Sequence, residues 1–273
     1  MMINGTGKMT WEGIISDPLG GRVTAKPRKS GKTIISDLGY GLGEVSDFLS
    51  NCGYYIDRAK LAFGTSVLYS EEYLKEKIRL YRQAGINVNP GGTCAEIAIY
   101  QGVYDSWLKK AKELGFTTIE ISDGTIPMDQ ALREKVIGKA VTSGFEVVSE
   151  VGKKDEKNQL TLAQTIDQIK KDAQLGVKSI TVEARGSAKG IGVFGADGKV
   201  KADDVDAILN AGVPAETFVW EAPTKDGQEF FINRLGNNVN LGNVRYFEVI
   251  ALEGLRRGLR GDTLRMAIQQ RSR

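Results

Sequence analysis

Polar side chains, most of them ionisable, recur where short apolar segments of this chain end. The residues at these points are Asp37, Lys60, Asn89, Asp123, Glu150, Glu183, Glu221 and Asn240. The chain contains no histidine, so it lacks the commonest general acid–base residue and the commonest transition-metal ligand. A Ser-His-Asp triad and a His-rich zinc site are therefore excluded. Any acid–base or metal chemistry must use carboxylates, lysines, arginines, tyrosines or a hard metal ion.

Carboxylates form the first candidate group. They are Glu120, Asp123, Glu150, Glu183 and Glu221. Oxygen ligands without histidine or thiolate beside them suit Mg2+, which prefers hard donors and keeps several waters. The alternative is that these acids are neutralised in ion pairs with Lys60, Lys153 and Arg185.

Two lysines form the second group. Lys60 lies in an apolar segment, and Lys153 follows Glu150 closely. A lysine beside a ligand site can bind an anion, act as an acid or form a Schiff base. The alternative, an ordinary surface lysine, applies more to Lys153 than to Lys60, and most of all to Lys154.

Three short segments are candidates for substrate binding. The run from Glu183 to Gly192 combines small residues with Arg185 and Lys189, and glycines let backbone N–H groups approach an oxyanion. The segment 90–93 offers Gly92 and Thr93 for a similar approach. Asn240, with Asn243, could donate amide hydrogens to phosphate. The alternatives are a mobile loop, a tight turn and a pair of local turn caps.

A repeated unit positions these residues: a brief β-branched segment, a polar turn, an amphipathic helix and then glycine. Eight candidate strands are expected at Thr33–Asp37, Tyr55–Leu61, Ile86–Asn89, Thr117–Asp123, Phe145–Val151, Ser179–Ala184, Thr217–Glu221 and Asn238–Leu241. They are nearly continuous in apolar character, as parallel strands buried on both faces are. Between these segments, apolar residues recur at the spacing of one helix face, as at Leu162, Ile166, Ile169 and Ala173.

Glycines follow seven of the expected helices, where a left-handed residue would end each helix. They are Gly53, Gly85, Gly115, Gly144, Gly176, Gly212 and Gly236. Eight units of about 30 residues predict an α/β fold, a (βα)8 TIM barrel, whose active site lies at the C-terminal ends of the strands. An open doubly wound sheet is the alternative, but the chain has no glycine-rich nucleotide fingerprint.

One barrel domain is expected over residues 32–273, preceded by an N-terminal extension over residues 1–31. Trp11, Ile14 and Ile15 are expected to form a short helix that plugs the bottom of the barrel. The chain has 273 residues, of which 41% are hydrophobic, enough for one large core. No apolar run approaches the roughly 20 residues that span a bilayer, and no signal peptide is expected.

The cysteines and the charge distribution indicate the cellular location and the kinds of partner to expect. Cys52 and Cys94 are far apart and lack metal-ligand spacing, which fits a reduced cytoplasmic location. The formal net charge is +3 and the basic residues are scattered, apart from a basic tail over Arg256–Arg273. No aromatic residues interleave with that tail, so a solvated helix face is expected there rather than a nucleic-acid surface.

Ordered motifs along nearly the whole chain resemble the phosphosulfolactate synthase family. The similar stretches are Lys26–Arg28, Tyr55–Asp57, Phe63–Ser66, Gly91–Thr93, Ile119–Thr125, Ser149–Lys153, Glu183–Arg185, Glu221–Pro223, Asn238–Leu241 and Leu255–Thr263. The resemblance implies a lyase-class (βα)8 barrel that adds sulfite to phosphoenolpyruvate with Mg2+. The implied product is (2R)-phospho-3-sulfolactate, formed by Michael-type addition through an aci-carboxylate. Its downstream use, for coenzyme M or for sulfolactate, is left open, and a homo-oligomer such as a trimer is implied.

Roles follow for the candidate residues under this resemblance. Lys153 is expected to protonate C2, Lys60 to gather sulfite, and Asp37 to be a further catalytic group. The remaining candidates are Glu150 and Glu183 as Mg2+ ligands, supported by Glu120 and Asp123, and Arg185, Lys189, Asn240, Gly92 and Thr93 as substrate ligands.

This chain departs from the family pattern at two strand ends. Leu38 follows Asp37 where the family usually has lysine, and Ala62-Phe63 follows Leu61 where the family usually has glycine-tryptophan. The absence of a lysine at position 38 would alter anion binding. The substrate could therefore differ from that of the family. Two other functions remain open. One is another barrel enzyme that acts on a phosphorylated carboxylate or sugar, such as a lysine Schiff-base aldolase. The other is a non-catalytic relative of a plant heat-stress family.

Overall fold

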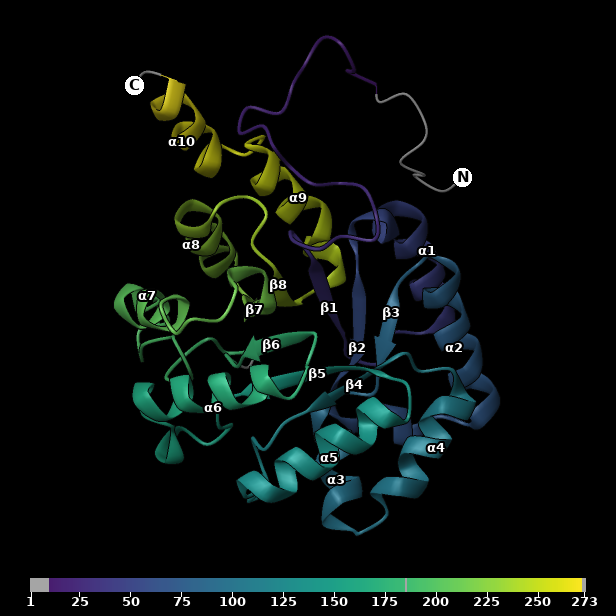
Figure 1. Ribbon diagram of the computed structural model, residues 1–273. Helices are drawn as coiled ribbons and strands as arrows, with labels where there is room; N and C mark the ends of the chain where they lie inside the picture. Colours follow the sequence, from purple (N-terminus) through teal and green to yellow (C-terminus); the bar gives the residue numbers. More distant parts are fainter. Residues whose placement is uncertain (1–9, 185, 272–273) are drawn as a thin grey trace.

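A computed structural model describes residues 10–184 and 186–271 as one ring of parallel strands surrounded by helices (Figure 1). The strands are β1 Thr33–Asp37, β2 Arg58–Leu61, β3 Asn87–Asn89, β4 Thr118–Ile121, β5 Glu146–Val151, β6 Ser179–Val182, β7 Phe218–Glu221 and β8 Leu241–Val244. The helices are α1 Leu42–Cys52, α2 Glu71–Gln83, α3 Gly92–Tyr100, α4 Tyr104–Leu114, α5 Gln130–Thr142, α6 Leu162–Gln174, α7 Ala202–Leu209, α8 Lys225–Leu235, α9 Val249–Arg257 and α10 Gly261–Arg271.

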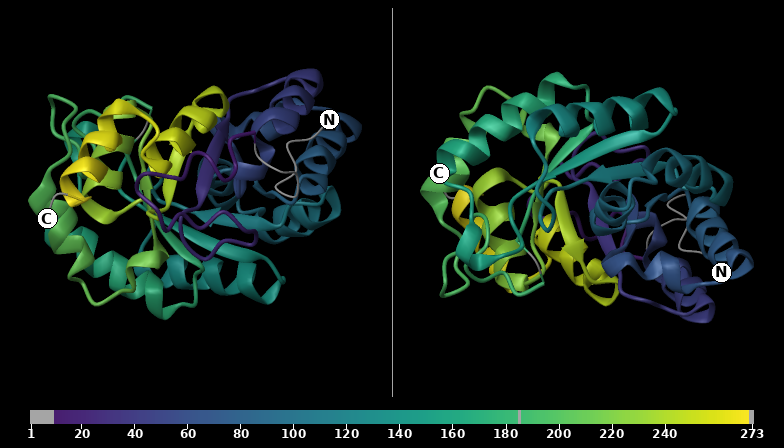
Figure 2. Two further views of the ribbon diagram at one scale, coloured as in Figure 1. Left: turned by 90° about the horizontal axis from the view of Figure 1, so that it is seen from above. Right: turned by 90° about the horizontal axis from the view of Figure 1, so that it is seen from below.

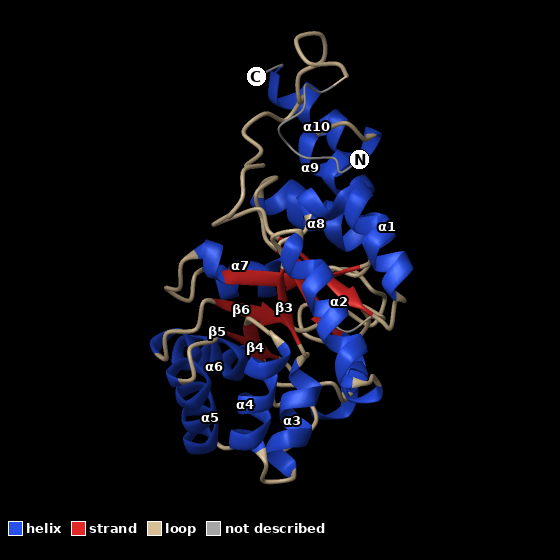
Figure 3. Cartoon of the chain, turned by 90° about the vertical axis from the view of Figure 1, so that its right-hand side faces the viewer, coloured by secondary structure: helices blue, strands red, loops and turns tan. Residues whose placement is uncertain are grey.

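The sheet runs in the order β3-β2-β1-β8-β7-β6-β5-β4, so the first and last units of the chain are neighbours. The two edge strands meet where the Thr117 amide donates to the Val88 carbonyl at 3.1 Å. This contact nearly closes the ring into a (βα)8 barrel, and Figures 2 and 3 show the strands inside the helical layer. The predicted fold class is therefore confirmed, and the open sheet is excluded.

Alternation along the strands separates two layers of side chains. On β2, Ala59 and Leu61 are buried in the apolar core, whereas Arg58 and Lys60 make polar contacts with other strands across the barrel interior. Successive strand residues point to opposite faces, so the outer face of each strand packs against helices. The inner face carries charge, and the charged residues must satisfy one another inside the barrel.

Strand boundaries differ from expectation mainly at the end of the sheet. Seven strands lie within their predicted ranges, shortened by up to three residues. The eighth was predicted at Asn238–Leu241, but β8 spans Leu241–Val244. The apolar residues Val239 and Leu241 suggested a strand there, but the β1 register pairs Thr33 with Leu241 and Ile35 with Val244. The strand therefore begins where the prediction ended it.

Helix ends follow local rules in most units. Helix α6 begins with a capping box between Thr161 and Gln164, in which each side chain satisfies a free backbone N–H. Gly115 ends α4 in the left-handed region at φ 95°. Gly53 departs from that expectation, because its φ is −55° and the chain continues into a 3-10 turn. None of the described helices is long and apolar enough to cross a bilayer.

The N-terminal segment does not plug the barrel as expected. Trp11, Ile14 and Ile15 are 60%, 77% and 56% exposed, so their expected role was wrong. The later part of the segment crosses one end of the barrel (Figure 2, left). It is attached there by Arg28, whose guanidinium contacts the Asp57 carboxylate at 2.9 Å.

The basic tail contains a buried arginine at its start. Arg256 on α9 is fully buried and donates to the carbonyls of Asn237, Val239 and Lys32. Burial lowers its pKa to about 9. This side chain satisfies backbone groups at the start of β1 and β8, so it serves the fold and is not part of a solvated face.

Candidate active site

Lys60 is the centre of the charged layer at the C-terminal ends of the strands. Its Nζ lies 2.7 Å from Glu150 Oε2, 2.8 Å from Glu120 Oε1 and 3.6 Å from Glu221 Oε1. Burial disfavours its charge, but these carboxylates outweigh burial and raise the pKa of Lys60 well above its usual value. The lysine is therefore an ammonium at neutral pH, and it brings together acids from strands β4, β5 and β7.

The acids around Lys60 differ in their protonation. Glu150 and Glu183 are 0% and 3% exposed. Burial opposes ionisation of Glu150, but Lys60 and Lys154 lower its pKa. Burial, together with the nearby Glu150 and Glu221, raises the pKa of Glu183 well above its usual value. The site thus holds more carboxylate than its lysines neutralise, a condition that a bound cation would relieve.

Glu120 is held by hydrogen bonds from the start of α3 and from β3. It accepts hydrogen bonds from the Gly92 amide at 2.9 Å and from Asn89 at 3.2 Å, besides contacting Lys60. Gly92 is the first residue of α3, and a side chain there would collide with the Ser122 hydroxyl. The N–H of Gly92, expected to bind substrate, is therefore directed at Glu120.

The two adjacent lysines after β5 reach different partners. Lys153 Nζ lies 2.8 Å from the Asp123 carbonyl and also pairs with the Asp123 carboxylate. Lys154 Nζ lies 3.1 Å from Thr93 Oγ1 and 3.4 Å from Glu150 Oε1. Burial would lower the pKa of Lys154, but Glu150 and its neighbours raise it. Lys154 was predicted to be a surface residue. Of these two lysines, it is the one that lies beside the acids around Lys60.

Asp123 belongs to a separate ion-pair group with Lys153. Its carboxylate also lies 3.3 Å from Arg133 of α5. Arg133 in turn binds Asp172 of α6 at 2.6 Å. This chain of charges connects the end of β4 to the helical layer, and Asp123 was expected instead to support a metal ion.

Asp37, expected to be catalytic, is directed toward α2. Its carboxylate lies 2.8 Å from Lys77 Nζ and accepts a 2.8 Å hydrogen bond from the Tyr81 hydroxyl. Both side chains of the ion pair are 0% exposed. Burial and the Asp37 charge raise the pKa of Tyr81 far above its usual value. The neighbour on the inner face is Ser36, which donates to Asn243 Oδ1 at 2.7 Å.

Asn240 lies at the opposite end of the barrel from these acids. Its amide donates to the carbonyls of Glu216 and Phe218 and accepts from the Lys32 amide. These groups lie at or just before the starts of β7 and β1, so the residue expected to bind phosphate joins the strand starts. Because β8 begins at Leu241, directly after Asn240, Asn243 lies near the strand end and donates to Glu221 Oε2 at 3.3 Å.

A cavity of about 640 Å³ opens over the acids. Its lining residues are Ser36, Leu38, Lys60, Ala62, Phe63, Thr93, Lys154, Glu183, Gly186, Ser187, Glu221, Pro223, Asn243 and Arg245. Thr93 is therefore at the cavity, as expected for a substrate ligand. Lys189 is exposed on the loop after β6, and Arg185 lies outside the described residues.

Three residues in or beside the cavity were missed from the sequence: Arg245, Glu96 and Lys154. Arg245 lines the cavity because it directly follows β8, which ends at Val244 rather than at the predicted Leu241. Glu96 of α3 is 1% exposed and accepts from the Thr125 amide at 2.9 Å and from Ser122. A carboxylate inside an apolar helical segment was the signal for Glu96. Lys154 had no signal that separated it from Lys153.

Hard oxygen donors are concentrated here, and this donor set is the one that Mg2+ prefers. Within the described ranges, no three acidic residues already surround a common point as metal ligands would. Instead, Lys60 occupies the space between them, and the crowding of Glu183 with Glu150 and Glu221 marks where a cation would be stabilised. The residues present therefore fit a hard cation in composition and charge.

Comparisons with known proteins agree with this architecture. Residues 21–262 match the family model described as (2R)-phospho-3-sulfolactate synthase (ComA). The phosphosulfolactate synthase of Methanocaldococcus jannaschii is 43% identical over 235 residues, covering 85% of this chain and 93% of that protein. The phosphosulfolactate synthase of Methanothermobacter thermautotrophicus is 37% identical over 243 residues, covering 88% and 94%.

A solved structure supports the fold alone. The 3-hexulose-6-phosphate synthase of Salmonella typhimurium superposes with a TM-score of 0.53 at 12% identity, covering 87% of this chain and 99% of that one. The family match and the curated relatives carry the assignment further, because both span most of the chain and name one enzyme. This chain is an enzyme that belongs to the (2R)-phospho-3-sulfolactate synthase family.

Proposed function

We propose that the cavity catalyses the Mg2+-dependent addition of sulfite to phosphoenolpyruvate, giving (2R)-phospho-3-sulfolactate. One observation carries the proposal: buried glutamates surround Lys60, and Lys154 enters the same cavity from the side. Two anions must meet in this reaction, so cationic groups are needed beside the acids. Lys60, Lys154 and Arg245 provide them.

The reaction balances without an oxidant or a reductant. The sulfur lone pair of sulfite forms a bond to C3 of phosphoenolpyruvate, and the C2–C3 double-bond electrons move onto the substrate carboxylate. That electron pair then returns to C2 as a proton arrives there. A bound Mg2+ would act as a Lewis acid for the charge on the carboxylate, and Glu183, Glu221 and Glu150 are the residues that would hold it.

Lys154 is the residue we assign as the proton donor to C2, in place of Lys153. Its Nζ is at the cavity, and its raised pKa keeps it protonated at neutral pH. Thr93 accepts a hydrogen bond from this ammonium and fixes its direction. Lys153 is occupied by Asp123.

Anion binding falls to the rim of the cavity. Arg245, Ser187 and Asn243 line it and can donate hydrogen bonds to phosphate. Lys189, on the loop after β6, and Arg185, which lies outside the described residues, remain predicted phosphate ligands. Leu38 takes the place of a lysine at the rim. We place sulfite near Lys60.

A lysine Schiff-base aldolase is the competing enzyme. A Schiff base requires a neutral amine, which enzymes obtain by lowering the pKa of a lysine. The acids around Lys60 instead raise its pKa, as they do for Lys154. The geometry therefore favours acid catalysis and anion binding over imine formation.

The test is incubation of the purified protein with phosphoenolpyruvate, sulfite and Mg2+, followed by mass spectrometry for the phosphosulfolactate mass. We expect the product only when all three are present, and its loss with a chelator and return with added Mg2+. Turnover that persists in chelator would remove the metal from the proposal. Consumption of phosphoenolpyruvate without sulfite would point to another barrel enzyme.

A further inference from the structure

A second cavity, of about 400 Å³, lies at the opposite end of the barrel from the candidate active site. It is lined by residues that begin strands or precede them, among them Lys32, Ile34, Arg58, Asn87 and Ser179, and by the segment Lys26–Arg28. The active site of a (βα)8 barrel lies at the other end of the strands. The proposed function therefore makes no use of this cavity.

Cations outnumber acids in this cavity. Lys26, Arg28, Lys32 and Arg58 line it together with only two carboxylates, Asp57 and Glu146. Arg28 and Asp57 neutralise each other at 2.9 Å. Lys26 donates to the Gly53 carbonyl at 3.0 Å, and burial lowers its pKa to about 8. Glu146 is the remaining carboxylate of the lining. Glu120 and Glu150, which lie outside the lining, also favour the charge of Arg58, so among the described residues the positive charge left without a nearby carboxylate is that of Lys32.

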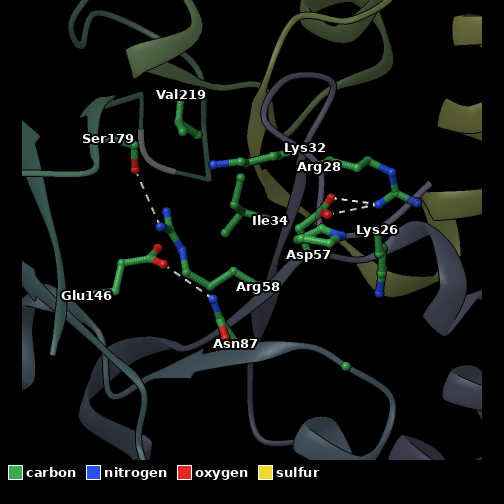
Figure 4. A pocket seen from close by; sticks show the side chains of 12 residues that line it. Lys26, Arg28, Lys32, Ile34, Asp57, Arg58, Asn87, Glu146, Ser179 and Val219 are labelled. Carbon is green, nitrogen blue, oxygen red and sulfur yellow. Dashed lines mark hydrogen bonds and ion pairs between the residues drawn. The ribbon is translucent and has the colours of Figure 1, made fainter. Parts of the chain in front are cut away.

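Two of these cations face the interior of the cavity. Figure 4 shows the side chains of Lys32, which precedes β1, and Arg58 of β2 extending toward Ser179, with Ile34 beside them. Arg58 is 6% exposed and reaches Ser179 Oγ only at 3.5 Å. Within residues 10–184 and 186–271, its Nε has no hydrogen-bond partner. In the same part of the chain, the ammonium of Lys32 makes no hydrogen bond or ion pair.

An arginine buried with an unsatisfied donor is costly, because a buried polar group without a partner loses its hydration. The Nε of Arg28 in the same cavity also lacks a hydrogen-bond partner among the described residues, but its Nη1 meets the Asp57 carboxylate. The guanidinium of Arg58 instead meets the hydroxyl of Ser179 at 3.5 Å. Glu146 does not pair with this guanidinium, since its carboxylate is directed to Asn87 at 3.5 Å (Figure 4). The donors of Lys32, Arg58 and Ser179 together match the oxygens of a tetrahedral oxyanion.

We propose that this cavity is a second anion site, which binds a phosphate group between Lys32, Arg58 and Ser179. The phosphate is either free phosphate or the terminal group of a small phosphate monoester. Bound there, it would neutralise the Lys32–Arg58 side of the barrel and contact β1, β2 and β6 together. The site is separate from the proposed function, and neither depends on the other.

The test measures radiolabelled phosphate binding by equilibrium dialysis at pH 7 and low ionic strength. The variant is Lys32→Met, and the matched control is Lys29→Met, an exposed lysine three residues away that does not line the cavity. We expect Lys32→Met to bind one fewer phosphate per protein, or to bind that phosphate roughly tenfold more weakly. A tenfold change in affinity corresponds to about 1.4 kcal/mol. Lys29→Met is expected to match the parent protein.

Unchanged binding in Lys32→Met would overturn the proposal, as would an equal loss in Lys29→Met, which would indicate a diffuse charge effect. Melting curves by circular dichroism check that both variants fold. Lys32 Nζ makes no hydrogen bond or ion pair among the described residues, so its replacement should leave the fold intact. Binding at the active site is common to all three proteins and cancels from the comparison.

The source of the phosphate is distinguished by competition with glycerol 3-phosphate. Displacement of the Lys32-dependent equivalent at a concentration well below that of phosphate identifies a monoester site, and weaker displacement identifies free phosphate. Crystals soaked in tungstate give an independent location. An anomalous peak between Lys32 and Arg58 is expected, and tungstate found only in the 640 Å³ cavity would contradict the proposal.

Discussion

Lys153 and Lys154 are neighbours in the chain, but their ammonium groups serve different clusters. Lys153 Nζ is 2.8 Å from the Asp123 carbonyl, whereas Lys154 Nζ is 3.1 Å from Thr93 Oγ1 and lines the cavity. Both follow β5, and the turn of the chain after Gly152, whose φ is 139°, separates their directions. The first prediction follows from this difference.

Lys154→Met is expected to lower kcat by about 10²- to 10⁴-fold, the range for loss of a general acid. Lys153→Met removes a lysine of the same type one position away and serves as the matched control. It is expected to retain most of kcat, with a loss of stability from unpairing Asp123. Steady-state kinetics and thermal melts on both proteins measure this. If Lys153→Met is the inactive variant, the original assignment of the proton donor is restored.

Glu183 provides a prediction about pH and metal binding. Burial and its neighbouring carboxylates raise its pKa, so it holds a proton at pH values where an ordinary glutamate is ionised. A cation bound at this carboxylate must displace that proton, so apparent Mg2+ affinity should increase with pH until the raised pKa is passed. Calorimetry in two buffers of different ionisation enthalpy measures proton release.

The matched variant for this test is Glu183→Gln, which keeps the shape of the side chain without the titrating group. We expect proton release to disappear and Mg2+ binding to weaken. Mg2+ binding by the parent protein that releases no proton, and is independent of pH, would show that the cation binds elsewhere.

Asp37 and Lys77 make a buried ion pair whose loss should affect stability. Removing one partner of such a pair leaves an uncompensated buried charge and costs about 3–5 kcal/mol. Lys77→Met is therefore expected to lower the free energy of unfolding by that amount. Lys75→Met on the same helix breaks an exposed pair with Glu71 and should cost at most about 1 kcal/mol. Urea denaturation compares them, and equal losses would contradict the importance of burial.

Asn240 and Asn243 give a prediction that separates the two ends of the barrel. Asn240→Ala removes three hydrogen bonds to backbone groups, and each unsatisfied partner costs about 1–3 kcal/mol. It should destabilise the fold while the folded fraction keeps its KM. Asn243→Ala should instead raise KM for phosphoenolpyruvate, because Asn243 lines the cavity. A raised KM in Asn240→Ala alone would support the original phosphate assignment.

The sequence by itself determined the architecture. Eight apolar segments with glycines between them predicted the barrel, because buried parallel strands and amphipathic helices leave periodic patterns that need no knowledge of contacts. It also located the acids, since Glu120, Glu150 and Glu221 lie on strands and Glu183 follows one, and buried charges in a strand pattern are conspicuous. The absence of histidine restricted the chemistry before any geometry was known.

Tertiary structure decided the partner of each charged group. Strand alternation directs Asp37 outward to Lys77 and Ser36 inward to Asn243, and the pairing of β8 with β1 moves Asn240 to the far end of the barrel. A shift of a few residues along a strand changes both the face and the end at which a side chain lies. The hydrophobic pattern of the sequence does not predict such shifts, because they depend on hydrogen bonds between segments some 200 residues apart.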